Sequence, residues 1–207
     1  MAGTAMTPAA VAGRGVRRAR GRAGFTLIEL LVAAGVFVVA AGVAIPMLSR
    51  ALEQYRLGMA ARDIERELQT ARANAVTTNR PIRVRFNCPA VGQYRRVEVI
   101  GDPWQADPAD IPSTRCSTTS YPYPVADQDP TTRPNHDGPL RRLPTGVAMG
   151  ATWSMEFWPD GTARTASGDG TGTWAVIPAG GAAVSVTNGT LSRAIAVNSM
   201  GRVQLLR

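Results

Sequence analysis

The chain has 207 residues, enough for one domain with appended segments, and a net charge of +8. All 23 basic residues are arginines, and the absence of lysine excludes a P-loop lysine, a Schiff-base lysine and a Ser–Lys dyad. Five of the arginines precede Gly24, and the rest of the chain has 18 arginines against 15 acidic residues, a net charge of +3. The positive charge is therefore concentrated at the N-terminus, which weakens the case for a nucleic-acid partner of the main domain.

Residues 25–48 form an apolar segment whose only charged residue is Glu29. A helix over residues 25–45 would be about 32 Å long, which matches the hydrocarbon core of a bilayer. The upstream arginines predict a cytoplasmic N-terminal side and place the chain after residue 48 outside. A secretory signal peptide fits less well, because the apolar run is too long and no small-residue cleavage site follows it. Glu29 is unusual in a permanent anchor, since a carboxylate deep in a spanning helix costs about 2.5–3.5 kcal/mol.

The stretch GFTLIELLVA, residues 24–33, resembles the prepilin signature of type IV pilins and type II secretion pseudopilins. The resemblance implies cleavage between Gly24 and Phe25 by a membrane aspartic peptidase, followed by N-methylation of Phe25. Glu29 would then neutralise the terminal amine of a neighbouring subunit, and Pro46 would be the helix-kinking proline of many pilins. The expected partners are a prepilin peptidase and methyltransferase, the inner membrane, and other pilins or pseudopilins bound through the N-terminal helix.

The same resemblance divides the chain into four segments. A basic leader (1–24) would be removed, and a transmembrane and assembly helix (25–48) would continue as an amphipathic helix (49–78) into a β-rich domain (80–207). The expected location is the bacterial inner membrane, crossed once, with the C-terminal domain in the periplasm and the protein assembled into a pilus or pseudopilus.

Apolar residues recur every three to five positions over residues 49–78, which predicts a helix with one buried face. The members of this stripe are Leu52, Tyr55, Met59, Ile64, Leu68, Ala71 and Ala75. Pro81 disfavours the helical conformation for the residue before it and should end the helix.

Alternation of apolar and polar residues predicts antiparallel strands in the rest of the chain. The predicted strands are IRVRF (82–86), YRRVEVI (94–100), WSMEFW (153–158), TWAVI (173–177), AAVSVT (182–187), RAIAV (193–197) and GRVQLLR (201–207). The expected fold class is α+β, a pilin-like fold with a long N-terminal helix, membrane-spanning in its first half, packed on an antiparallel β-rich domain.

Residues 101–146 hold nine of the 15 prolines and show little periodicity, so a long loop is expected there. Cys88 and Cys116 are 28 positions apart and match no metal-ligand spacing. In an exported domain they would form a disulfide, worth about 3 kcal/mol, that ties the loop to the first strand. Two unpaired buried thiols are the alternative.

The stretches MEFWPDGTA (155–163) and RAIAVNSMGRVQLLR (193–207) resemble the GspH/FimT group of minor pilins and pseudopilins. The resemblance implies a minor pseudopilin of a type II secretion system, acting in filament tip formation or initiation and in protein export. The alternative is a FimT-like minor type IV pilin that binds DNA during natural transformation. The DNA-binding residues would then be Arg193, Arg202 and Arg207.

Catalytic motifs are absent from the sequence. His136 is the only histidine, and no HExxH, GxSxG or P-loop pattern occurs. The aspartates of the 101–146 loop match no defined calcium-site spacing. The sequence therefore predicts neither an enzyme nor a metal or cofactor site.

Overall fold

The computed structural model describes residues 24–102, 112–124, 129, 132–150, 153–167 and 174–206. The chain divides between Ile45 and Pro46 into two compact units. The elements are, in chain order, α1 (Leu27–Thr78), β1 (Ile82–Phe86), β2 (Gln93–Glu98), α2 (Pro112–Arg115), β3 (Arg141–Arg142), β4 (Ala148–Met149), β5 (Trp153–Phe157), β6 (Ala163–Ser167), β7 (Ala175–Val176), β8 (Ala182–Asn188), β9 (Leu191–Val197) and β10 (Val203–Leu206).

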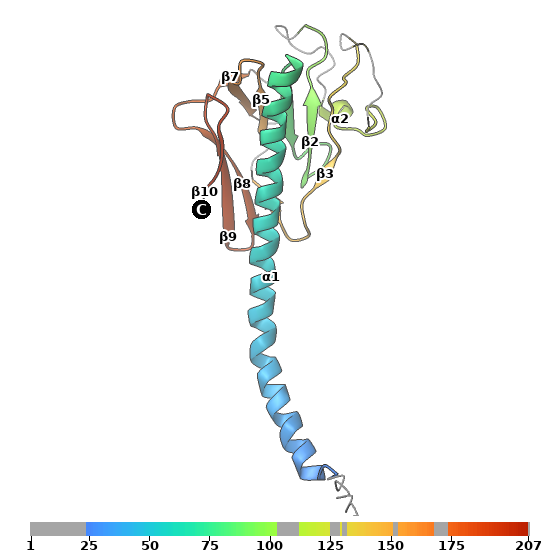
Figure 1. Cartoon of the computed structure of the whole chain (residues 1–207), viewed down its shortest axis with the longest axis vertical. Coiled ribbons are helices and arrows are strands. Elements are labelled where there is room, and N and C mark those ends of the chain that lie inside the picture. Colours follow the sequence, from blue (N-terminus) through green and yellow to red (C-terminus); the bar gives the residue numbers. More distant parts are fainter. Residues whose placement is uncertain are drawn as a thin grey trace, which may run out of the picture. The chain divides into compact units, whose positions relative to one another are not determined.

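The strands form two sheets in which every pairing is antiparallel. The first sheet has the order β3-β2-β1-β5-β6-β7, and the second has the order β10-β9-β8-β4. The second half of α1 runs beside both sheets (Figure 1). The predicted α+β class, one long helix packed on an antiparallel β-rich domain, is confirmed.

One face of α1 packs against both sheets and forms the core. Its buried apolar side chains recur with helical spacing from Leu57 to Ala75, and four of the seven are alanines, which let the strands approach the helix closely. The predicted stripe is wrong in its first part, because Leu52, Tyr55 and Met59 are 45%, 66% and 38% exposed. Burial of the helix face begins only at Leu57, so the apolar residues before it remain on the surface.

Helix α1 ends in a cap formed by its own backbone. Asn79 adopts a left-handed conformation with φ 56°, and the Arg80 N–H donates to the Ala75 carbonyl at 3.3 Å. This hydrogen bond spans five residues, as in a Schellman motif, where asparagine is the usual substitute for glycine. The cap turns the chain back into β1.

Strand β6 was not predicted from the sequence. It pairs with β5 over five residues, and Ala163 and Ala166, which lie on opposite faces of the strand, are both buried. Alanine, serine and threonine produce little contrast between apolar and polar positions, so the periodicity of this strand is weak. The loop region also contains α2 and the two-residue strand β3.

The arginines of β1 are buried, although they alternate with the core residues. Arg83 is 5% exposed, and its Nε donates to a Glu156 carboxylate oxygen at 2.6 Å. The indole N–H of Trp158 donates to the other oxygen of Glu156 at 2.5 Å, and the Arg83 guanidinium lies 4.6 Å from the centre of the Trp174 ring. The sheet therefore buries a paired polar layer on the face opposite α1, where a sequence pattern predicts solvent.

Arg95 of β2 holds the 101–146 loop against the sheet. It is fully buried, and its guanidinium donates to the carbonyl oxygens of Gly138 at 2.9 Å, Ser117 at 3.1 Å and Tyr121 at 2.7 Å. Burial lowers the pKa of Arg95, and the nearby Asp137 carboxylate opposes that shift. One charged side chain thus satisfies carbonyls from three positions of a loop with little regular structure.

Asp137 binds a second buried arginine, Arg115, which lies in the same loop, and it also contacts β2. Both oxygens of Asp137 accept from Arg115, at 2.8 and 3.0 Å, and Oδ1 also accepts from the Glu98 N–H at 2.8 Å. Next to this pair a disulfide joins Cys88 to Cys116, with their Cα atoms 5.7 Å apart. The loop is therefore attached to the sheet by a covalent bond and by buried ion pairs.

A junction near the C-terminus connects α1 with two turns that are far apart in sequence. Arg72 donates to the carbonyl oxygens of Gly161 at 3.5 Å and Met200 at 3.2 Å. Gly201 is buried with φ +68°, and a Cβ atom there would overlap the Gly161 carbonyl oxygen. Both turns therefore require a residue without a side chain at position 201.

We expect Asp137→Ala to lower the free energy of unfolding by about 3–5 kcal/mol, because it leaves buried arginines without their carboxylate. Denaturation of the full chain in detergent measures this loss. The matched control is Arg141→Ala, which removes an ion pair to Glu67 from a side chain that is 52% exposed. The control should lose only about 0–1 kcal/mol. Equal losses in both variants would contradict the assigned role of Asp137.

We expect Gly201→Ala to destabilise the chain by about 2–4 kcal/mol, because strain at positive φ adds to overlap with the facing turn. Gly189→Ala is the control, since Gly189 also has positive φ but has nothing within 4 Å of an added Cβ. That variant should lose only about 1–2 kcal/mol. Midpoints of chemical denaturation for both variants give the comparison, and a smaller loss at position 201 would refute the junction.

Candidate functional site

The N-terminal turn of α1 contains the residues of the prepilin-like signature. The Glu29 N–H donates to the Thr26 hydroxyl at 3.3 Å, and the Leu30 N–H donates to the Thr26 carbonyl at 3.2 Å. Thr26 is therefore the N-cap, and Glu29 occupies the third helical position. This arrangement places the carboxylate in the first turn, next to Phe25 and at the positive end of the helix dipole.

The apolar part of α1 is exposed along its whole length. It contains an 18-residue window long and apolar enough to cross a membrane, and none of that window is buried. Phe25 is 80% exposed and Phe37 is 78% exposed, with the aliphatic residues between them similarly open. In water such a surface would be unstable, so it requires lipid or apolar surfaces of other helices around it.

Pro46 lies inside α1, at the boundary of the two units. Proline has no backbone N–H, so the carbonyl of Gly42 lacks its usual helical partner. The Ser49 hydroxyl donates to the Pro46 carbonyl at 3.0 Å, which satisfies one further acceptor near this position.

Two of the three candidate DNA-binding arginines, Arg193 and Arg202, belong to the described residues, and these two do not lie together. Arg202 precedes β10, and Arg193 lies in β9. The register pairs Val203 with Val197, so Arg193 and Arg202 lie at opposite ends of the hairpin, about 17 Å apart along the strands. Arg207 lies outside the described residues.

The structure instead brings together the two C-terminal motifs. The turn that follows WSMEF in sequence contacts the turn before β10, where the Ala163 N–H donates to the Ser199 carbonyl at 2.9 Å. Within the first turn, Thr162 donates to the Asp160 carboxylate through its N–H at 2.9 Å and its hydroxyl at 2.6 Å. These hydrogen bonds lower the pKa of Asp160. The Arg72 link to this junction was missed, because nothing in a helical pattern distinguishes it from a solvated arginine.

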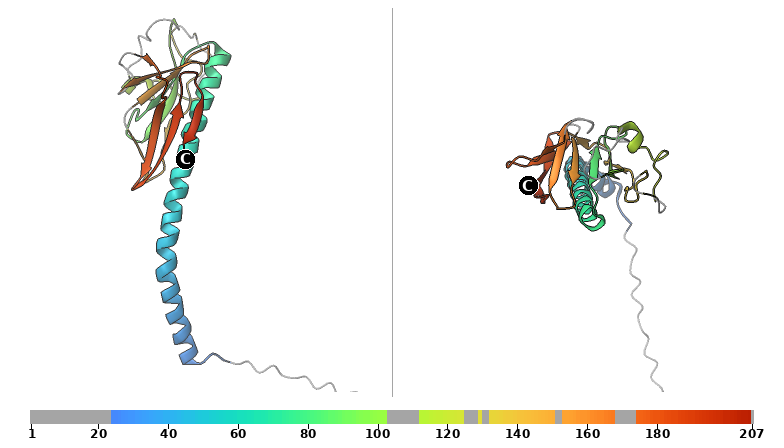
Figure 2. Two further views of the ribbon diagram at one scale, coloured as in Figure 1. Left: turned by 90° about the vertical axis from the view of Figure 1, so that its left-hand side faces the viewer. Right: turned by 90° about the horizontal axis from the view of Figure 1, so that it is seen from above.

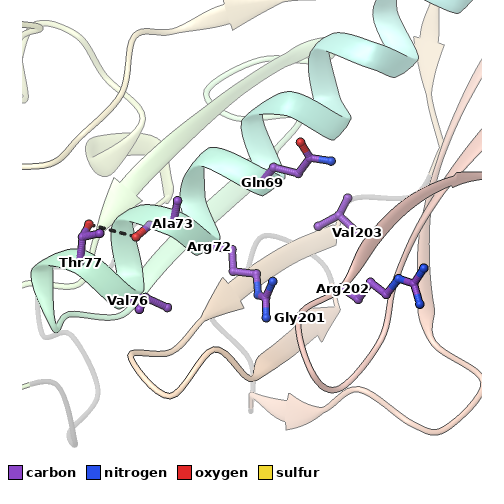
Figure 3. A pocket seen from close by; sticks show the side chains of 8 residues that line it. All are labelled: Gln69, Arg72, Ala73, Val76, Thr77, Gly201, Arg202 and Val203. Atoms are coloured by element: carbon purple, nitrogen blue, oxygen red, sulfur yellow. Dashed lines mark hydrogen bonds between the residues drawn. The ribbon is translucent and has the colours of Figure 1, made fainter.

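A groove of about 520 Å³ lies beside this junction, between α1 and the start of β10 (Figure 3). Its lining residues are Gln69, Arg72, Ala73, Val76, Thr77, Gly201, Arg202 and Val203. Val76 is 51% exposed, and the lining includes two arginines and no acidic residue. Among the described residues, no group of three or more histidines, cysteines or acids is placed to hold a metal ion.

Known proteins resemble this chain in two ways: one family model matches its N-terminal segment, and solved structures of two proteins align with most of its length. The family model of the prokaryotic N-terminal methylation motif matches residues 19–45, and no curated protein sequence matches the chain. The type IV minor pilin FimU of Pseudomonas aeruginosa aligns with a TM-score of 0.43 and 14% identity, over 75% of this chain and 91% of that one. The minor pseudopilin EpsH of the Vibrio cholerae Type 2 Secretion System aligns with a TM-score of 0.41 and 10% identity, over 73% and 96%.

The matched segment includes Gly24, Phe25 and Glu29, the residues on which the prepilin resemblance was based. It also covers most of the exposed apolar part of α1. The chain therefore carries a prokaryotic N-terminal methylation motif at the start of one long helix that packs on antiparallel sheets.

Proposed function

We propose that the protein is a structural subunit of a pilus or pseudopilus, cleaved between Gly24 and Phe25 and assembled through α1. The observation that carries the proposal is the position of Glu29, which lies in the capped first turn of an exposed apolar helix with a methylation motif. Cleavage would create a free amine at Phe25, within one helical turn of the carboxylate. A helix that only anchors an enzyme in the membrane does not require a carboxylate at this position.

Assembly explains how the carboxylate is stabilised. Within the described part of the chain, the Glu29 side chain has no hydrogen bond or ion pair. In a bundle of subunits, the terminal amine of a neighbour would offset the desolvation of Glu29 in a medium of low dielectric constant. The subunit would remain in the membrane until assembly, and in the filament a neighbouring subunit would supply the amine that pairs with Glu29.

Exposed apolar residues at the end of the membrane segment and after it support the same proposal. Leu48, Leu52, Tyr55 and Met59 follow each other at spacings of four and three, so they share one face of α1. Their exposed fractions range from 38% for Met59 to 66% for Tyr55. Helices of neighbouring subunits would cover this face in a filament.

The finer proposal is a minor pseudopilin of a type II secretion system, acting at the filament tip or in initiation. Its support is the GspH/FimT-like sequence of the two C-terminal turns, which belong to one junction around Arg72 and Gly201. The C-terminal domain would lie in the periplasm, where the Cys88–Cys116 disulfide would be stable. DNA uptake is a weaker candidate, because Arg193 and Arg202 lie at opposite ends of their hairpin.

We expect co-expression with a prepilin peptidase to shorten the chain by 24 residues and leave N-methylated Phe25, as measured by intact-mass spectrometry. Gly24→Val should block this cleavage, because the added side chain occupies the position next to the scissile bond. Gly35→Val is the control in the exposed helix, where nothing lies within 4 Å of an added Cβ, and it should be cleaved normally. Normal processing of Gly24→Val would refute the motif assignment.

We expect Glu29→Gln to be cleaved and to remain in the membrane, but to enter filaments at least tenfold less than the wild type, a factor that corresponds to about 1.4 kcal/mol. The substitution preserves shape and removes only the charge that would pair with the neighbouring amine. Sheared filament fractions, quantified by immunoblot, measure incorporation. Glu53→Gln, which alters an exposed carboxylate beyond the apolar segment, is the control. Wild-type incorporation of Glu29→Gln would exclude the proposed pairing.

A further inference from the structure

The second sheet ends at an open edge. β10 is its outermost strand, and within the described part of the chain it pairs with β9 alone. The groove described above is lined by Val203, the first residue of this strand, and by α1. In Figure 2 the darkest red strand, β10, lies beside the helix. An unpaired edge next to a groove can accept an additional strand.

The hydrogen-bond pattern shows which backbone groups of β10 point outward. The Asn198 N–H donates to the Arg202 carbonyl at 3.2 Å, so the backbone groups of Arg202 point toward β9. Because hydrogen-bonded and non-hydrogen-bonded pairs alternate in an antiparallel ladder, Gln204 and Leu206 also bond to β9. The N–H and C=O groups of Val203 and Leu205 therefore point away from the sheet.

The β8–β9 hairpin leads to the same assignment independently. Asn188 pairs with Leu191 across a two-residue turn, which makes this pair hydrogen-bonded. Counting along β9, Ile195 and Val197 then bond to β8, whereas Ala194 and Ala196 bond to β10. Their partners on β10 are Leu206 and Gln204, as inferred above.

The side chains beside the edge define the chemistry of a suitable strand. Val76, Ala73 and Val203 supply apolar surface in the groove, and Figure 3 shows Arg72 and Arg202 extending into or beside it. Arg202 is exposed, and no acidic side chain lines the groove. The charge complement of this surface is an acidic segment.

A second copy of the chain is a poor occupant. Pairing two β10 strands would add a second Arg202 to a surface whose lining residues include arginines and no acidic side chain, so the charges of the two copies would not complement each other. Arginines at an edge of this kind disfavour self-association.

We propose that the edge of β10 binds an extended segment of another protein in which apolar residues alternate with aspartate or glutamate. The segment pairs with the outward N–H and C=O groups of Val203 and Leu205 as a fifth strand. An apolar side chain enters the groove against Val76, and a carboxylate binds Arg202. This interaction goes beyond subunit assembly through α1 and does not depend on it.

The test uses the full chain in lipid nanodiscs and two heptapeptide libraries. In both libraries Val, Ile, Leu or Phe alternates with a charged residue, which is Asp or Glu in one and Lys or Arg in the other. We expect the nanodiscs to retain the acidic library at least tenfold better. Equal retention, or no retention of either library, would overturn the proposal.

Two variants, each with a matched control, locate the binding site. Arg202→Glu should abolish retention of the acidic library, whereas Arg193→Glu, at the other end of the hairpin, should retain it. Val76→Trp should weaken binding at least tenfold by filling the groove, whereas Arg62→Trp, also on an exposed part of α1, should leave it unchanged. Equal effects within either pair would overturn the site, and unchanged melting temperatures establish that the variants fold.

Amide exchange of the labelled chain distinguishes strand addition from other contacts. With a retained acidic peptide bound, exchange at Val203 and Leu205 should slow at least tenfold, while exchange at Gln204 and Leu206 should change little. Slowing without peptide that grows with protein concentration would show self-pairing and overturn the proposal. Displacement of the peptide by a dT oligonucleotide that binds more tightly through Arg202 would assign the surface to nucleic acid instead.

Discussion

The packing of one face of α1 across both sheets is the interaction on which the rest of the structure depends. Ile64 and Leu68 fill the space between the helix and the strands, and Ala71 and Ala75 allow the last turns to approach closely. Arg72 follows Ala71 in sequence and is exposed, and its side chain reaches the two turns near the C-terminus. The helix thereby fixes the position of β10 and creates the groove beside it.

The buried arginines have their partners within the chain, whereas the exposed Glu29 carboxylate has none among the described residues. Arg83, Arg95 and Arg115 are removed from water, and each has a carboxylate or several carbonyl oxygens within hydrogen-bond distance. Removing one partner from such a network is more damaging than the pairing is stabilising, so the network keeps the loop in one arrangement. Glu29, by contrast, lies in an exposed helical turn and depends on a partner from outside the chain in the proposed assembly.

Several features could be predicted from the sequence because they depend on local patterns. The long helix and the strand at IRVRF follow from periodicity. Strand β6 could not be predicted, because its small side chains carry little periodic contrast. Arg85 and Arg95 are buried, which the alternation of their strands does not predict, and for Arg95 the 101–146 loop supplies the hydrogen-bond partners.

Only the tertiary structure separated Arg193 from Arg202, joined the turns at Gly161 and Met200 through Arg72, and left the edge of β10 open. The physical reason is that strand register and helix packing determine distances between side chains, and neither can be inferred from local periodicity.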